Sequence, residues 1–141
     1  MKKVLVGIGV VVVVVIVLVL VINPLSDIEK QAVVAIERLQ EVLKDPNSLE
    51  VHGIRWEAVH ENTRVDEDGN YLYVFVIDYS AKNSLGGMHR DKARVYSGGI
   101  IFASDADSDD AEEKVYAKLA VDGWNDNEEN AVDVDKVMRG R

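Results

Sequence analysis

The residues best suited to chemistry lie in one stretch, residues 78–96, which reads DYSAKNSLGGMHRDKARVY. From Lys82 to Arg94 it carries four basic side chains and one acidic one, a formal charge of +3 in a chain of −9. Asn and Gly adopt positive φ readily, and successive backbone N–H groups in such a turn can hold an anion. The stretch therefore predicts an anion-binding site with six candidate ligand-binding residues: Lys82, Asn83, Gly86, Gly87, His89 and Arg90.

The same stretch also fits an architectural role. Asn83, Gly86 and Gly87 are typical of a chain reversal between two strands. Basic side chains on an edge strand stay hydrated and oppose sheet-to-sheet aggregation. We favour this interpretation over the anion site.

A second candidate is the acidic run that follows the basic stretch, because alternating carboxylates are what an oxygen-liganded Ca²⁺ loop needs. Its weak candidate ligands are Asp105, Asp107 and Asp109. Aligned as an EF-hand loop from Asp105, position six is Asp110 rather than Gly, and position twelve is Tyr116 rather than Glu. We therefore predict no metal site and assign the acids to a helix N-terminus, where the helix dipole favours negative charge.

Catalytic patterns are absent from the sequence. His52, His60 and His89 fall on different segments, whereas zinc requires a close tetrahedral set of ligands. No Gly-x-Ser-x-Gly elbow, His-Glu-x-x-His helix, phosphate loop or dinucleotide fingerprint occurs. We predict no cofactor and no catalytic residue, and we favour a role other than catalysis.

The elements that position these residues follow from periodicity and turn signals. SDIE at residues 26–29 is a capping-box pattern, and helical spacing of apolar residues continues until Pro46 disfavours helix. Strand-like segments follow at residues 49–60, 71–80 and 92–104, with an Asp-Gly turn signal at residues 66–70. Gly98 and Gly99 predict a bulge or bend in the third segment.

A second amphipathic helix is predicted after the acidic run. Ala111, Val115 and Leu119 form its apolar stripe, and Asp122-Gly123 is its predicted end. The fold class is therefore α+β. We expect an antiparallel sheet of three strands, or slightly more, packed by two amphipathic helices.

The N-terminal residues differ from the rest of the chain. Residues 4–22 read VLVGIGVVVVVVIVLVLVI and would rise about 28 Å as a helix, close to the roughly 30 Å hydrocarbon thickness of a bilayer. A cleaved signal and a buried soluble segment are the alternatives, but the run exceeds a signal core and lacks a small-x-small cleavage site. We expect an uncleaved transmembrane signal-anchor that contacts the membrane through Val4, Val12, Ile16 and Ile22.

Charge sets the expected orientation and partners. Lys2 and Lys3 precede the apolar run, so we expect a single-pass cell-membrane protein with a cytoplasmic N-terminus and an extracytoplasmic C-terminal domain. Without these two lysines the chain's charge of −9 becomes −11, which disfavours nucleic acid. The expected partners are membrane lipid, through the N-terminal helix, and another protein of unknown identity.

Two motifs carry a resemblance to a known family. LKDPNSLEVHGIRW at residues 43–56 and YSAKNSLGGM at residues 79–88 resemble a small bacterial and phage domain of unknown function, often secreted or membrane-anchored. The chain departs from that pattern at Ser80, where the family often has Asn, and at Leu85 and Met88, where it often has aromatics. The resemblance implies an extracytoplasmic α+β module and supplies no catalytic residues.

The expected organisation is a signal-anchor at residues 1–23, a small α+β domain at 24–124, and a polar C-terminal segment at 125–141. That last segment is either a weak terminal helix or a mobile tail. The leading hypothesis is a membrane-anchored, non-catalytic module that binds another protein at the cell envelope or has a structural role. The alternative is a small anion-binding or ligand-binding domain, or an enzyme, that uses the basic loop at residues 82–94.

Overall fold

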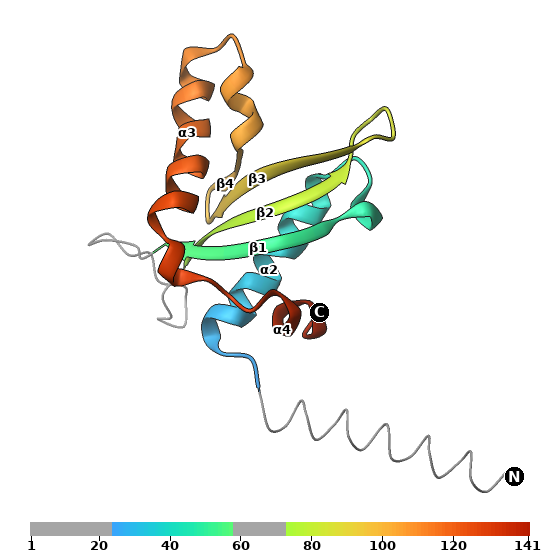
Figure 1. Ribbon diagram of the computed structural model, residues 1–141, viewed down its shortest axis with the longest axis vertical. Coiled ribbons are helices and arrows are strands. Elements are labelled where there is room, and N and C mark those ends of the chain that lie inside the picture. Colours follow the sequence, from blue (N-terminus) through green and yellow to red (C-terminus); the bar gives the residue numbers. More distant parts are fainter. Residues whose placement is uncertain (1–23, 58–72) are drawn as a thin grey trace, which may run out of the picture.

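The structure is a computed structural model that describes residues 24–57 and 73–141. Figure 1 shows one α+β unit in which a sheet carries helices on both faces. In chain order the elements are α2 (Asp27–Val42), η1 (Pro46–Ser48), β1 (Glu50–Glu57), β2 (Val74–Lys82), β3 (Met88–Tyr96), β4 (Gly99–Phe102), η2 (Ala103–Asp107), α3 (Ala111–Asp126), η3 (Glu128–Asn130) and α4 (Val134–Arg139).

The sheet is antiparallel and its strand order is β1-β2-β3-β4. Four strands fall within the predicted size, but Gly98 and Gly99 do not form the expected bulge or bend within one strand. Tyr96 pairs with Gly99, so the chain reverses between β3 and β4 at this point. The predicted turn at residues 66–70 lies outside the described residues.

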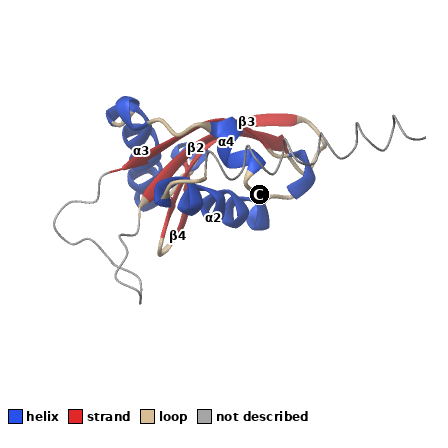
Figure 2. Cartoon of the chain, turned by 90° about the horizontal axis from the view of Figure 1, so that it is seen from below, coloured by secondary structure: helices blue, strands red, loops and turns tan. Residues whose placement is uncertain are grey.

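α2 covers one face of the sheet (Figure 2). It begins at the predicted capping box, in which the Glu29 backbone N–H donates to Ser26 Oγ and the Ser26 N–H donates to a Glu29 carboxylate oxygen. Its buried side chains follow helical spacing, and side chains at every second position of the strands meet them. The core contains, among others, Ala32, Ala35, Ile36, Leu39, Ile54, Phe75, Ile77, Tyr79, Ala93 and Val95.

α3 covers part of the opposite face. Gly123 lies so close to the sheet that a Cβ built on it would be 1.9 Å from Glu57 Oε1 and 3.0 Å from a Val76 methyl. Glu57 and Val76 occupy strand positions that alternate with those facing α2. The helix therefore approaches the sheet through a residue without a side chain.

The predicted end of this helix was wrong, because α3 continues through Gly123 to Asp126. Packing on the sheet, rather than helix termination, explains the glycine. The predicted apolar stripe also does not face the core. Ala117, Ala120 and Gly123 are the buried residues of α3, whereas Val115 and Leu119 are exposed.

Of the two alternatives for residues 125–141, the structure has a short helix. The side chain of Val137 in α4 is fully buried, and the Val132 N–H donates to the Ile54 carbonyl at 2.9 Å. Lys136 pairs with Glu29 at 2.8 Å, and this hydrogen bond lowers the pKa of Glu29. The C-terminal residues thus hold the start of α2 and the edge strand β1.

The predicted single-pass membrane arrangement is corrected here. In the described ranges, 24–57 and 73–141, no helix is long and apolar enough to cross a bilayer. α2 and α3 have 16 residues each, a rise of about 24 Å, and both carry charged side chains. This finding contradicts the predicted anchor and cell-membrane localisation. The predicted membrane residues, Val4, Val12, Ile16 and Ile22, lie outside the described residues.

Candidate functional site

The basic stretch forms the hairpin between β2 and β3, and Asn83 organises its turn. The Asn83 side-chain oxygen accepts hydrogen bonds from the N–H groups of Leu85 and Gly87, each at 3.0 Å. Gly86 donates to the Asn83 carbonyl and has a φ of 82°, a conformation that favours glycine. Because the turn's own side chain engages these amides, they are not arranged as an open anion nest.

The candidate ligands of this loop are not brought together. Arg90 pairs across the sheet with Ser80, and His89 pairs with Ala81, which is buried in the core on the α2 side. Neighbouring strand residues point to opposite faces, so Arg90 and His89 lie on different sides of the sheet. Lys82, at the end of β2, shares the Arg90 side through its pairing with Met88.

Arg90 is already engaged by a carboxylate. Its guanidinium donates to both oxygens of Asp78, at 3.0 and 2.7 Å, in a bidentate pair. Asp78 is only 6% exposed, and the hydrogen bond from Arg90 lowers its pKa despite the opposing effect of burial. Asp78 in turn raises the pKa of Arg90. The pair is a structural element of the sheet.

Three further cations on this face also have partners inside the domain. Arg94 donates to both oxygens of Glu57, with the shortest contact at 2.7 Å, and both side chains are mostly buried. The Lys92 ammonium lies 5.8 Å from the centre of the Trp124 ring, and the Arg55 guanidinium lies 4.0 Å from it. Carboxylates thus pair with two of the four cations of the basic stretch, and the Trp124 contacts attach α3 to the sheet.

A Ser-His pair is present, but no carboxylate in the described ranges completes a triad with it. His52 Nε2 and Ser80 Oγ are 2.7 Å apart on the sheet face that Arg90 shares. Both oxygens of the nearby Asp78 accept hydrogen bonds from Arg90. Asp78 therefore does not orient the imidazole of His52. His60 lies outside the described residues.

The two motifs that carry the family resemblance meet in space. The Lys82 N–H donates to Ser48 Oγ at 2.8 Å, and the Ser48 hydroxyl donates to the Asp45 carbonyl. This joins the LKDPNS segment to the AKNS segment at one end of the sheet. Each motif therefore has a clear architectural role.

The last residue of the acidic run caps a helix. Asp110 Oδ1 accepts hydrogen bonds from the N–H groups of Glu112 and Glu113 at the start of α3. Asp105 and Asp107 belong to η2, and Asp109 is exposed. Within the residues that the structure describes, no three Asp, Glu or His side chains gather closely enough to hold a metal.

The outer side of α3 carries three large apolar side chains, which we call the α3 face: Val115, Tyr116 and Leu119. They are 66%, 47% and 41% exposed and lie one helical turn or less apart. The N-terminal half of α3 and the adjoining η2 segment extend beyond the strands (Figure 1). The α3 face is therefore open to another molecule.

Acidic residues surround the α3 face. Glu112 lies one turn before Val115 and Tyr116, and Asp122 lies one turn after Leu119. Residues 104–126 contain eight acidic and two basic side chains, a net formal charge of −6. One of the two bases, Lys118, is paired with Asp122 at 3.0 Å. The α3 face is therefore an apolar patch surrounded by acidic residues.

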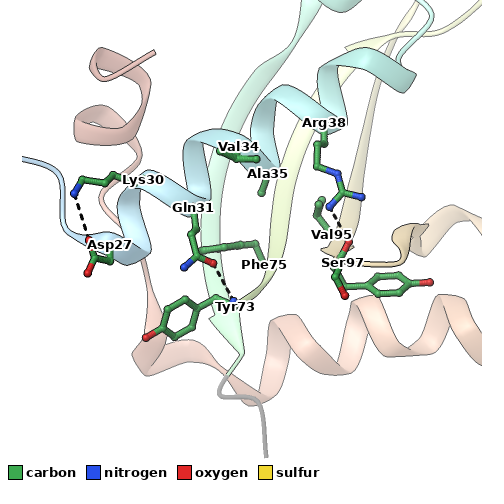
Figure 3. A pocket seen from close by; sticks show the side chains of 11 residues that line it. Asp27, Lys30, Gln31, Val34, Ala35, Arg38, Tyr73, Phe75, Val95 and Ser97 are labelled. Carbon is green, nitrogen blue, oxygen red and sulfur yellow. Dashed lines mark hydrogen bonds and ion pairs between the residues drawn. The ribbon is translucent and has the colours of Figure 1, made fainter. Parts of the chain in front are cut away.

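A concave surface, which we call the α2 groove, lies between α2 and the ends of β2 and β3 (Figure 3). Its volume is about 380 Å³. Its lining is largely apolar between two polar ends: Asp27, Lys30, Gln31, Val34, Ala35, Arg38, Tyr73, Phe75, Val95, Tyr96 and Ser97.

The polar ends of the α2 groove are fixed by hydrogen bonds that Figure 3 shows. Lys30 pairs with Asp27 at 3.3 Å, and Arg38 Nη1 donates to the Tyr96 carbonyl at 2.9 Å. The Tyr73 ring packs edge-on against Trp56, with ring centres 5.5 Å apart. The groove walls are therefore held in place by the fold.

Comparisons with protein-family models, curated proteins and solved structures give no match for this chain. The family resemblance based on the two motifs therefore stays a prediction. The α3 face, the α2 groove and the basic hairpin are the candidate functional surfaces of the described residues.

Sequence reasoning drew attention to the basic hairpin and passed over the other two surfaces. The α3 stripe was visible in the spacing of Val115 and Leu119, but the pattern does not reveal which side of a helix meets the sheet. The alanines at 117 and 120 were the missed signal for close packing. The α2 groove left no signal, because it depends on where α2 lies relative to β3.

Proposed function

We propose that this protein is a non-catalytic binding module whose α3 face docks a basic amphipathic segment of another protein. One observation carries the proposal: Val115, Tyr116 and Leu119 are exposed together on one side of a helix whose other side is attached to the sheet. Isolated exposed apolar residues are ordinary, but a grouped apolar patch with a polar surround is typical of an interaction site.

The charge around the α3 face supports the choice of partner. A net charge of −6 over residues 104–126 favours a partner with Lys or Arg beside its apolar residues. An amphipathic helix supplies both, since its apolar positions repeat at three and four residues and its basic positions flank them. Acidic partners are disfavoured by the same charge.

The basic hairpin is the weaker candidate for function. Arg90 and Arg94 are each paired with a carboxylate, and Asn83 engages two of the turn amides. A ligand anion would have to compete with these internal partners. The α3 face has no such competitor among the described residues, because its apolar side chains are exposed.

The test uses the full chain and a labelled synthetic helix with leucines on one side and lysines flanking them. We expect saturable binding by fluorescence anisotropy that weakens as salt concentration rises. Replacing Val115 and Leu119 together by Gln should weaken binding at least about tenfold. Gln keeps helix propensity and adds no charge.

Leu85→Gln is the matched control, because Leu85 is 93% exposed at the tip of the β2–β3 turn, away from α3. Its affinity should stay within about twofold of wild type. A counterpart peptide with glutamates in place of the lysines should not bind. Equal binding of both peptides, or equal loss in both variants, would refute the proposal.

A further inference from the structure

We propose that the α2 groove is a binding site for an apolar monocarboxylate of the medium-chain fatty acid type, with Arg38 as the residue that receives the carboxylate. This site lies on the α2 side of the sheet and does not depend on the α3 face. The shape of the groove, its lining and the N–H donors that Arg38 retains support this assignment.

The lining has the layout of a small-molecule site. Its volume of about 380 Å³ lies within the range of roughly 300–1,000 Å³ that is usual for ligand pockets. Phe75 and Val95 form its floor and are each only 2% exposed, because the core fills the space beneath them. The accessible walls are Val34 and Tyr73, and Tyr96 contributes its backbone, so a ligand would lie along the groove rather than enter the core.

The length of the groove suits an extended chain. Lys30 and Arg38 lie at opposite ends, as Figure 3 shows, and eight residues of helix separate them, a rise of about 12 Å. Val34 and Ala35 occupy the same side of α2 between them. A largely apolar groove with a cation at each end favours a chain-like ligand with one charged head group.

The choice of head group follows from the charges. Lys30 is already paired with Asp27, whereas Arg38 donates one hydrogen bond to the neutral Tyr96 carbonyl. A guanidinium carries five N–H donors, so Arg38 retains donors for a two-oxygen acceptor. A planar carboxylate matches this geometry and carries one charge.

The opposite end disfavours other head groups. Asp27 lies in the lining, so a ligand with negative charge at both ends would meet a carboxylate there. An ammonium head would meet Arg38 at one end and, at the other, Lys30, which already pairs with Asp27. The combination selects an anionic head at the Arg38 end and an apolar remainder.

The experiment is an amide NMR titration of the full chain with decanoate, below the concentration at which it forms micelles. We expect saturable shifts at the amides of Ala35, Val95 and Tyr96. Residue-resolved shifts separate groove binding from adsorption to the apolar residues 4–22. Acetate, which has the head alone, and decyltrimethylammonium, which has the same chain with a cationic head, should not give these shifts.

Two variants make the assignment specific. Arg38→Gln should weaken decanoate binding at least about tenfold, since a charge-assisted hydrogen bond is lost. Val34→Trp should block the groove, and it should fold because Val34 is 53% exposed. Lys82→Gln removes an exposed cation of the basic hairpin and should leave the affinity unchanged.

The proposal is overturned if decanoate gives no saturable shifts in the groove, or if decyltrimethylammonium binds there equally well. It is also overturned if both Arg38→Gln and Val34→Trp bind decanoate as wild type does. If Arg38→Gln does not fold, the affinity of Val34→Trp for decanoate alone tests the proposal. Loss of binding in Lys82→Gln alone would place the anion site at the hairpin instead.

Discussion

The two long helices of this domain use their apolar residues in opposite ways. α2 buries Ala32, Ala35, Ile36 and Leu39 in the core, so its large side chains hold the fold together. α3 attaches through Ala117, Ala120 and Gly123 and leaves the large side chains of the α3 face exposed. Small residues allow close approach, so a helix can be fixed to a sheet while its large side chains face outward.

The contacts of Trp124 explain how α3 stays attached with so little apolar burial. The ring stacks beneath the Arg55 guanidinium, and it lies so close to Gly53 that a Cβ there would be 2.7 Å from the ring. Arg55 also donates to the Trp124 carbonyl. Cation–π and hydrogen-bond contacts at the C-terminal end of α3 thus complement the small residues further up the helix.

The largest expected difference between α2 and α3 comes from truncating one leucine on each helix. Leu39→Ala removes a fully buried side chain and should lower the free energy of unfolding by about 2–5 kcal/mol. Leu119→Ala should change it by no more than about 0.5 kcal/mol. Urea unfolding followed by circular dichroism measures both. Similar losses in the two variants would show that α3 is not peripheral to the core.

The second prediction concerns the close approach of α3. Gly123→Ala would place a Cβ against Glu57, which Arg94 holds in place, and should destabilise the fold by about 1–3 kcal/mol. At an exposed helix position the same change would stabilise by about 1 kcal/mol, so the sign of the effect is the test.

Gly87→Ala is the control for that substitution. A Cβ at Gly87 would meet Asn83 at an ordinary 3.7 Å, and its φ is not in the left-handed region. We expect a change within about 1 kcal/mol, in the stabilising direction. Stabilisation by Gly123→Ala would mean that α3 does not approach the sheet this closely.

The third prediction concerns Asp78, which lies on the sheet face that α3 covers only in part. The pKa of Asp78 is lowered by Arg90, so the ionised carboxylate stabilises the folded state above the unfolded pKa of about 3.9. That contribution is lost as pH falls through the folded pKa. Asp78→Asn should therefore cost about 1–2 kcal/mol at neutral pH, reduced by the exposure of Arg90, and flatten the acid limb of stability against pH.

Urea unfolding between about pH 2 and 7 measures this effect. Asp109→Asn removes an exposed carboxylate and is the control, with little change expected. Glu29, whose pKa Lys136 also lowers, keeps part of the pH dependence in every variant. An unchanged acid limb in Asp78→Asn would show that the pair with Arg90 is not formed in solution.

Much of the fold was predictable because it depends on local chemistry. The Ser26 and Glu29 capping box predicted the start of α2, and the apolar residues of β2 predicted a strand. The positions of Asn83 and Gly86 predicted a turn. These features need only a few neighbouring residues, so the sequence pattern suffices.

The remaining features depend on contacts between distant residues. Gly123 looked like a helix end because its true reason, contact with Glu57, lies across the fold. Arg90 and Arg94 looked available to an anion because their partners, Asp78 and Glu57, lie on other strands. The pairing of charges across a sheet, and the side of a helix that meets it, are set by tertiary packing.

The central claim is that the α3 face serves binding and not folding. The most direct measurement is the free energy of unfolding of the Val115→Gln, Leu119→Gln double variant, taken together with its affinity for the basic helical peptide. We predict an unfolding free energy within about 0.5 kcal/mol of wild type and an affinity at least about tenfold lower. A large loss of stability, or an unchanged affinity, would contradict the claim.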